Sequence, residues 1–356
     1  MRFLAIGRNS QESRFGEVVS KYVQASVISE LAIQQIIVEK NIELVIAHHG
    51  IYVPQANVVS VARKNQIRTI TWSQAYRKKC YIFAQNDTYH KSLLSLDNWN
   101  RELSIEEAKL TENYLASRDI GDNDWIRFAR VNTNQSMNLP FDLNSRPTAL
   151  LLTNVSWDAQ IHYDSRVFDN MYDWLHETIL FFESEPELNL IIRIHPAEIT
   201  GRIKSRDQVD LWLKSNFPDL PANIHVIHPN DPISTYSLFS KVNLGLIFAT
   251  KAGVEMAASG IPVVVAGESW IRNKGFSIDP KNKGEYLDVL RDFKSDASSL
   301  FVNQRRALEF AHFFFFRLMI PILSIRQISH YPYARPASLR NNQPKDSGAG
   351  FSNKLY

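Results

Sequence analysis

Two short motifs bring together residue types that could hold a phosphate group. The tetrapeptide Arg193-Ile194-His195-Pro196 ends one apolar run, 190–194, and Thr250-Lys251-Ala252-Gly253-Val254-Glu255 follows another, 244–249. Both runs predict β-strands, and open α/β sheets bind ligands at the carboxyl ends of their strands. We therefore expect both motifs on neighbouring strands at one edge of a sheet, where they would converge on the same negatively charged group.

His195 follows a predicted buried strand and precedes a proline, which places its imidazole at the rim of the sheet. There His195 and Arg193 could bind the diphosphate or monophosphate of a leaving group. The alternative is a structural histidine that bonds a loop carbonyl.

The second motif opens a predicted helix over 253–259. The Thr250 hydroxyl and the first helical N–H groups would hold a phosphate, and Gly253 would let the ligand approach the backbone. Glu255 could accept hydrogen bonds from ribose hydroxyls. The alternative is ordinary capping, with Thr250 as the N-cap and Glu255 favourable to the helix dipole.

Length and composition fit a globular protein of two domains, with 356 residues, 44% hydrophobic and 22% charged. The net charge of +3 is too balanced to predict a nucleic-acid partner. The single cysteine, Cys80, excludes a disulfide framework within the chain and a cysteine-based zinc site, and it fits a reducing compartment such as the cytoplasm. The start of the chain lacks the apolar core of a signal peptide.

The carboxyl-terminal half alternates strand and helix patterns. Five apolar runs alternate with helix patterns. This alternation predicts a parallel sheet of five or six strands that helices cover on both faces. The predicted strands are 149–155, 190–194, 224–227, 244–249 and 262–266.

The amino-terminal half predicts strands over 42–47 and 68–72, joined by a helix over 54–65, which is half of a parallel doubly wound domain. The predicted architecture is α/β, with two Rossmann-like domains that face a cleft. Residues 73–148 would form a lid and hinge. The expected domains are 1–145 and 146–300, followed by closing helices over 301–330 and a disordered tail over 331–356.

The motifs also carry a resemblance to a known group of proteins. The chain resembles the bacterial capsule polysaccharide biosynthesis proteins, which include transferases of Kdo from its CMP-activated form, and its His-Pro motif is similar to that of bacterial sialyltransferases of the GT-B fold. The likeness covers 149–280 well and the amino-terminal half loosely. Its residues are Trp157-Asp158-Ala159, Asp173-Trp174-Leu175, Arg193-Ile194-His195-Pro196-Ala197-Glu198, Gly253-Val254-Glu255-Met256-Ala257, Gly260-Ile261-Pro262-Val263, Ala47-His48-His49-Gly50 and Asp87-Thr88-Tyr89-His90.

This resemblance implies a metal-independent glycosyltransferase. His195 would contact the nucleotide phosphate, and a donor pocket would be completed by Arg193, Pro196, Glu198, Thr250, Lys251, Gly253 and Glu255. The paired acidic residues followed by glycine that supply a general base in the sialyltransferases have no match here. Because this motif is missing, the resemblance does not identify the general base.

Several polar residues could deprotonate an acceptor hydroxyl. We favour Asp158, three residues after the strand 149–155, and then His49, beside Gly50 at the end of the strand 42–47. The alternative for Asp158 is that it caps a turn or a helix. The alternative for His48 and His49 is that one of them bonds to the backbone. The remaining candidates, Asp87 and His90, could equally belong to a turn and a helix start.

No metal and no cofactor is expected, because His48 and His49 are adjacent and point apart, and no Asp-x-Asp run ends a strand. Aromatic and basic residues over 72–79 suit an acceptor site, or simply a solvated loop. The apolar window 313–325 is too short to span a membrane. It could contact the inner face of a membrane beside Arg305, Arg306 and Arg317, or form a core helix.

Together these features predict a cytoplasmic, GT-B-like glycosyltransferase. It would move a sugar, such as Kdo or another CMP-activated sugar, from a nucleotide donor to a capsular or surface polysaccharide or its lipid anchor. Two rivals remain: a nucleotide-sugar epimerase of the same fold, and a non-catalytic capsule assembly or export component that has lost its base.

Overall fold

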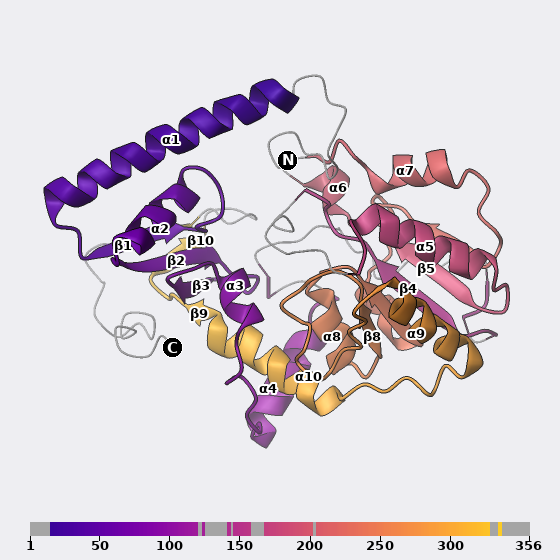
Figure 1. Ribbon diagram of the computed structural model, residues 1–356. Coiled ribbons are helices and arrows are strands. Elements are labelled where there is room, and N and C mark those ends of the chain that lie inside the picture. The colour runs from indigo at the N-terminus through magenta and orange to yellow at the C-terminus, as the bar shows by residue number, and fades with distance from the viewer. Residues whose placement is uncertain are drawn as a thin grey trace. The chain divides into compact units, whose positions relative to one another are not determined.

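The computed structural model describes residues 15–119, 123–124, 141–143, 145–157, 167–201, 204–327 and 334–336. Within these ranges the chain forms two compact units (Figure 1). Unit 1 draws on Asn100–Asp122 and Arg127–His312, and unit 2 on Ser10–Trp99, Asn123–Ile126 and Phe313–Tyr356. Each unit has its own sheet and is described by itself.

Unit 1 is built on a parallel sheet of five strands, as the sequence predicted, in the order β6-β5-β4-β7-β8. Every residue of β4, β5, β7 and β8 is buried. Continuous burial is expected of strands that helices cover on both faces. The strands are β4 (Thr148–Leu152), β5 (Asn189–Arg193), β6 (Ile224–Ile227), β7 (Leu244–Ile247) and β8 (Val263–Val265).

Helices connect these strands and extend beyond them. The longest crossover, α5, begins at the side chain of Asn170, whose Oδ1 accepts hydrogen bonds from the N–H groups of Tyr172 and Asp173. The helical elements of unit 1 are α4 (Ile105–Ala116), α5 (Met171–Glu183), α6 (Ala197–Thr200), α7 (Val209–Asn216), the 3-10 helix η3 (Tyr236–Lys241), α8 (Ala252–Ala258), α9 (Lys283–Ser295) and α10 (Gln304–His312).

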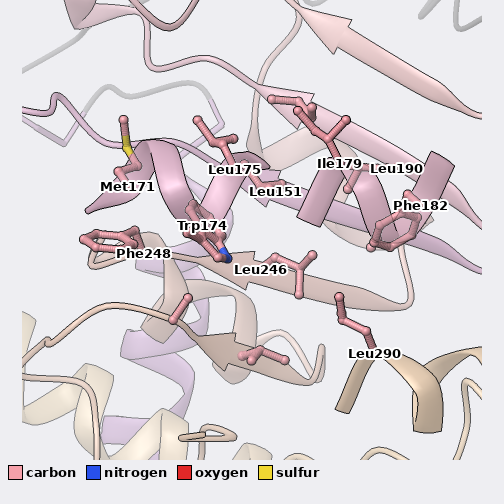
Figure 2. Close-up of a cluster of buried hydrophobic side chains, with 14 of the residues drawn as sticks. Leu151, Met171, Trp174, Leu175, Ile179, Phe182, Leu190, Leu246, Phe248 and Leu290 are labelled. Carbon is pink, nitrogen blue, oxygen red and sulfur yellow. The ribbon is translucent and has the colours of Figure 1, made fainter. Parts of the chain in front are cut away.

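The core of unit 1 lies where α5 packs on the sheet. Figure 2 shows its side chains, Trp174 among them, gathered against Leu246 and Phe248. The Trp174 ring lies 5.7 Å from that of Phe248, and its Nε1–H donates to Tyr286 Oη at 2.9 Å. The indole is fully buried. The polar edge of this large apolar side chain is thereby satisfied inside the core, which fixes α5 and α9 against the sheet.

The strand order contains a switch point. From β4 the chain adds β5 and β6 on one side, then crosses back to add β7 and β8 on the other. At such a point the connections leave the strand ends in opposite directions, and a crevice forms outside the carboxyl ends of the two central strands. In this sheet those strands are β4 and β7.

Unit 2 has a mixed sheet in the order β1-β2-β3-β9. Strands β1 and β2 are parallel and are joined through α2, as predicted, whereas β3 is antiparallel to both β2 and β9. A turn of five residues joins β2 to β3, and so short a link can join only antiparallel strands. The elements are α1 (Phe15–Lys40), β1 (Leu44–His48), α2 (Gln55–Lys64), β2 (Arg68–Gln74), β3 (Cys80–Gln85), α3 (Tyr89–Leu94), the π-helix η4 (Phe313–Leu318), β9 (Ile320–Pro321), β10 (Ile325–Gln327) and β11 (Ala334–Pro336).

The compact units divide the chain at places other than the predicted boundaries at 145 and 300. Helix α4 lies within the predicted first domain but packs in unit 1, where Thr111 Oγ1 and His312 Nδ1 are 2.9 Å apart. Conversely, 313–327 belongs to unit 2 because β9 pairs with β3. Within the predicted disordered tail, β11 pairs with β10, and the other tail residues lie outside the described ranges.

The apolar window after α10 matches the core alternative, since Phe314 and Phe315 are fully buried. Arg305 forms ion pairs with Glu102 and Glu309. Among the described residues, every helix is too short or too polar to cross a bilayer.

Candidate anion site at the carboxyl edge of the parallel sheet

The loop after β4 joins the two predicted motifs. Thr153 Oγ1 accepts a hydrogen bond from the backbone N–H of His195 at 2.9 Å, and Asn154 Oδ1 accepts one from Ala249 N–H at 3.2 Å. The motifs were expected on neighbouring strands, but β4 lies between β5 and β7. Their strands are therefore two spacings apart, about 10 Å.

Sequence reasoning missed Thr153 and Asn154. The available signal was a pair of hydrogen-bonding side chains directly after five apolar or buried strand residues, 148–152. Such residues commonly bind backbone groups of neighbouring loops. Here they fix the start of both motifs.

His195 is half-buried and is held as a neutral imidazole. Its Nδ1 accepts a hydrogen bond from the N–H of Ala197 at 3.1 Å, so the proton of the neutral ring is placed on Nε2. Burial first, and then the charges of Arg193 and Lys251, lower the pKa of His195 to about 4. At neutral pH the ring therefore offers an Nε2–H donor and no charge. The charge of Lys251 thus acts on the His195 ring.

Arg193 is buried and turned into the loop that follows β6. Its Nη1 donates to the carbonyl of His228, and its Nη2 donates to those of Asp231 and Ile233 at 3.4 and 3.3 Å. Burial lowers the pKa of Arg193 to about 10, against the opposing charge of Asp231, so the guanidinium stays protonated. These contacts order the loop 228–233, and the predicted phosphate contact of Arg193 stays a prediction.

Pro196 and Glu198 shape the start of α6 and α7. Pro196 occupies the N-cap position of α6, and the fully buried Glu198 accepts a hydrogen bond at Oε2 from Val209 N–H, at 3.0 Å. Because Val209 is the first residue of α7, this carboxyl acts as a cap. Burial raises the pKa of Glu198 to about 8, so the group is protonated at neutral pH. Their roles toward a ligand stay predictions.

The start of α8 differs from the expected capping by Thr250, because the N-cap residue is Lys251 and its side chain caps no N–H group. Thr250 Oγ1 accepts a weak hydrogen bond from Ala252 N–H at 3.4 Å, and the Thr250 carbonyl accepts one from Gly253 N–H at 3.2 Å. Gly253 has a steric role, because a Cβ there would lie 2.4 Å from Ile247 Cδ1. Glycine thus lets α8 pack closely on β7, whether or not a ligand also approaches.

Two residues of the second motif, Lys251 and Glu255, belong to a buried polar cluster. Glu255 Oε1 is 2.9 Å from Lys251 Nζ and 2.9 Å from Arg118 Nε, while Oε2 accepts a hydrogen bond from Tyr236 Oη at 3.0 Å. Arg118 Nη2 also donates to Tyr236 Oη at 2.8 Å. The exposed fraction of the side chain is 2% for Glu255, 7% for Arg118 and 13% for Lys251. Three donors surround the Glu255 carboxylate, and its predicted ribose contact stays a prediction.

The charges of this cluster depend on one another. Burial would raise the pKa of Glu255, but Arg118 and Lys251 outweigh it, so the carboxyl is ionised. Burial, assisted by Arg118 and opposed by Glu255, lowers the pKa of Lys251 to about 8. For Arg118 the lowering by burial is outweighed by Glu255 and the tyrosines, which raise its pKa. Lys251 is therefore the member whose charge is most easily changed.

The candidate bases lie elsewhere in the chain. His49 stands at the end of β1 in unit 2 with a left-handed backbone, φ 60, and its Nδ1 lies 3.2 Å from Ser73 Oγ. A non-glycine residue in this conformation is uncommon and is over-represented at functional sites. The ring of the neighbouring His48 lies 4.6 Å from that of Trp72. The favoured acid, Asp158, lies outside the described residues.

The remaining candidates have local partners. Asp87 pairs with Arg63 at 3.1 Å and accepts a hydrogen bond from Thr88 N–H, while Thr88 caps α3. The rings of Tyr89 and His90 lie 3.9 Å apart. These contacts match the alternative of a turn and a helix start. Within the described ranges, His, Cys, Asp and Glu form no group of three that could hold a metal.

Comparisons with known proteins give partial likenesses to solved structures. No family model matches the chain, and no curated protein sequence does. The β-Kdo 2,4-transferase of Thermosulfurimonas dismutans KpsC is 14% identical, with a TM-score of 0.48, over 83% of this chain and 85% of that one. Its β-Kdo 2,7-transferase is 10% identical, with a TM-score of 0.45 over 85% of each chain.

Sugar epimerases are also among the matches. A UDP-GlcNAc 2-epimerase from Neisseria meningitidis bound to UDP-GlcNAc is 10% identical, with a TM-score of 0.34, over 81% of this chain and 76% of that one. At these identities the likeness concerns the path of the chain. No residue role follows from it.

Proposed function

We propose that the chain is a glycosyltransferase that binds a nucleotide-activated sugar at the carboxyl edge of β5, β4 and β7. One observation carries the proposal: the loop after β4 binds the backbone of His195 and that of Ala249, just before the second motif, so both motifs follow strands that flank β4 at one edge of a parallel sheet. A neutral N–H donor and an ammonium group are together suited to a phosphate. Switch points are where sheets of this kind bind nucleotides.

The reaction would use these groups on the leaving side. The bond between the anomeric carbon and the donor phosphate oxygen breaks, and the electron pair stays on the phosphate. His195 Nε2–H would donate to that phosphate, while the Lys251 ammonium would offset the negative charge that develops on it. Both interactions strengthen as the bond breaks, and only such interactions speed the chemical step.

On the acceptor side, a hydroxyl oxygen forms the new bond to the anomeric carbon and loses its proton to a base. The proposed bases are Asp158 and then His49, whose ring is oriented by Ser73. Following the sequence resemblance, we propose a CMP-activated sugar such as Kdo as donor, and a capsular or surface polysaccharide or its lipid anchor as acceptor. The proposed place of action is the cytoplasm, including the inner face of its membrane.

Calorimetric titration of CMP, CDP, UDP and GDP tests the donor site. We expect one of them to bind wild type and to bind His195→Ala about 10- to 100-fold more weakly, the usual range for a lost hydrogen bond to a charged group. His228→Ala is the matched control, because this histidine directly follows the next strand, β6, and pairs with Asp210. If wild type binds none of the four nucleotides, the proposal fails.

Product analysis separates transfer from the rival functions. A transferase releases nucleotide only when acceptor is present, and an epimerase converts the donor sugar without acceptor. A protein that binds donor and leaves it intact with every acceptor tried would be a non-catalytic component. Asp158→Asn and His49→Ala then identify the base, since the true base variant binds donor normally but turns over slowly.

A further inference from the structure

We propose that Arg118 is a positioning residue for the anion site: by sharing the Glu255 carboxylate with Lys251, it leaves the cluster with a net positive charge that an anion at Lys251 can use. The inference rests on the proposed function for the identity of the ligand, a phosphate-bearing compound. It adds a residue that lies just beyond the carboxyl-terminal end of α4, 75 residues before the first motif and 132 before the second.

Arg118 and Lys251 compete for the same carboxylate oxygen of Glu255. Arg118 Nε and Lys251 Nζ both lie 2.9 Å from the same atom, Glu255 Oε1. The second carboxylate oxygen accepts from Tyr236, whose hydroxyl also accepts from Arg118 Nη2. Arg118 thus holds the carboxylate both directly and through the tyrosine. Lys251 shares one oxygen with a guanidinium that binds more rigidly.

The charge balance gives this arrangement a consequence for ligands. Arg118 and protonated Lys251 carry two positive charges, Glu255 carries one negative charge, and these three side chains together carry one net positive charge. Removing Arg118 lowers that sum by one and leaves Lys251 and Glu255 as a neutral pair. In a buried site the loss of one unit charge weakens anion binding about 10-fold or more, even though Arg118 need not touch the anion.

A purely structural role for Arg118 predicts something else. The guanidinium would then tie the end of α4 to α8, and its loss would lower stability without changing affinity for an anion. A ribose contact by Glu255 would likewise leave a simple inorganic anion unaffected. A charged probe without a ribose therefore distinguishes the charge role of Arg118 from both alternatives.

The experiment titrates inorganic pyrophosphate into the full chain at pH 7 and low salt, for wild type, Arg118→Met, Arg118→Lys and Tyr236→Phe. We expect Arg118→Met to bind about 10-fold more weakly and with a shallower salt dependence. Arg118→Lys keeps the charge and should stay within about 3-fold of wild type, and so should Tyr236→Phe, which removes a hydroxyl but no formal charge. Arg118→Met should fold, because Glu255 keeps Lys251 and Tyr236 as partners.

If wild type and Arg118→Met bind pyrophosphate equally well, the inference is overturned. It is also overturned if Arg118→Lys loses as much affinity as Arg118→Met, because the geometry of Arg118 and not its charge would then matter. Absence of pyrophosphate binding by wild type would overturn it as well. Failure of the proposed function looks different: pyrophosphate would bind and respond to Arg118→Met, while CMP, CDP, UDP and GDP bind no better than pyrophosphate. Melting curves of each variant confirm that folded protein is compared.

Discussion

Lys251 gives the proposed anion site a pH dependence whose sign follows from its surroundings. Burial and Arg118 lower the pKa of Lys251 to about 8 in the protein without ligand. A bound phosphate adds negative charge beside the ammonium and raises that pKa again. Binding therefore takes up a proton wherever the unliganded lysine is partly neutral. Affinity is full below about pH 8 and falls as the pH rises above it.

The size of the effect follows from the same pKa. With a pKa near 8, the ammonium form is about nine-tenths populated at pH 7 and about one-tenth at pH 9. If the bound form stays protonated, affinity falls about 10-fold between these values. His195 does not contribute, because its pKa of about 4 leaves it neutral throughout this range. Arg118, Glu255 and Tyr236, which face Lys251, keep their ionisation states as well, since their pKa values lie outside it.

Calorimetry at pH 7, 8 and 9 measures this dependence, using a nucleotide that wild type binds. At pH 8 two buffers of different ionisation enthalpy should reveal an uptake of about half a proton per ligand bound. Lys251→Met is the control: it should bind weakly and with the same affinity at all three values. A wild-type affinity that stays constant from pH 7 to pH 9 would refute the assignment of Lys251 to the anion.

Two further predictions concern the scaffold of unit 1. Trp174→Phe removes the donor to Tyr286 Oη and part of a fully buried ring, and it should lower the free energy of unfolding by about 1–3 kcal/mol in a denaturant titration; the exposed Leu211→Ala should change it by less than about 0.5 kcal/mol. Glu198 has its pKa raised above the unfolded value to about 8, so its native form prefers the proton, and stability should decline as the pH rises from about 4.5 through 8. Glu198→Gln should lack that decline in melting temperatures recorded over the same range, and an unchanged profile would contradict the burial argument.

The fold of unit 1 could be predicted because its local signals agree with one another. The strands are mostly continuous apolar runs, and α5 and α9 begin at capping side chains, those of Asn170 and Asn282. The strand over 224–227 was placed at its observed limits, and the other strand boundaries differ by at most a few residues. A parallel sheet covered on both faces leaves few other ways to bury such runs.

The division into units could not be predicted in the same way. Helix α4 reads as a polar helix, and nothing in its own sequence says which core receives Thr111 and Tyr114. Its partner His312 is 201 residues away in the chain. Likewise β9 is only two residues long, too short to give a strand pattern, and it exists because β3 offers an edge. Pairings between distant segments depend on tertiary packing, which local periodicity does not record.

In the candidate site, too, local sequence patterns identify some side chains and miss those that come from distant segments. His195 and Lys251 could be found because each follows a strand signal directly. Arg118 and Tyr236 could not, since Arg118 follows α4 in a stretch interpreted as a lid, and Tyr236 lies in a short 3-10 helix. Their importance comes only from a carboxylate that they reach from different directions.

That carboxylate network is a poor choice if stability alone were at stake. Taking Glu255, Arg118 and Lys251 out of water is costly, and well-packed apolar residues in place of buried ion groups are often neutral or stabilising. The cost is understandable if the network maintains a charge that a ligand uses. The loop after β4 binds the backbone of His195, and the charge of Lys251 acts on its ring, so the same edge of the sheet supplies a neutral donor and a shared cation. Together they favour a phosphate over a neutral ligand, because only an anion gains from both groups.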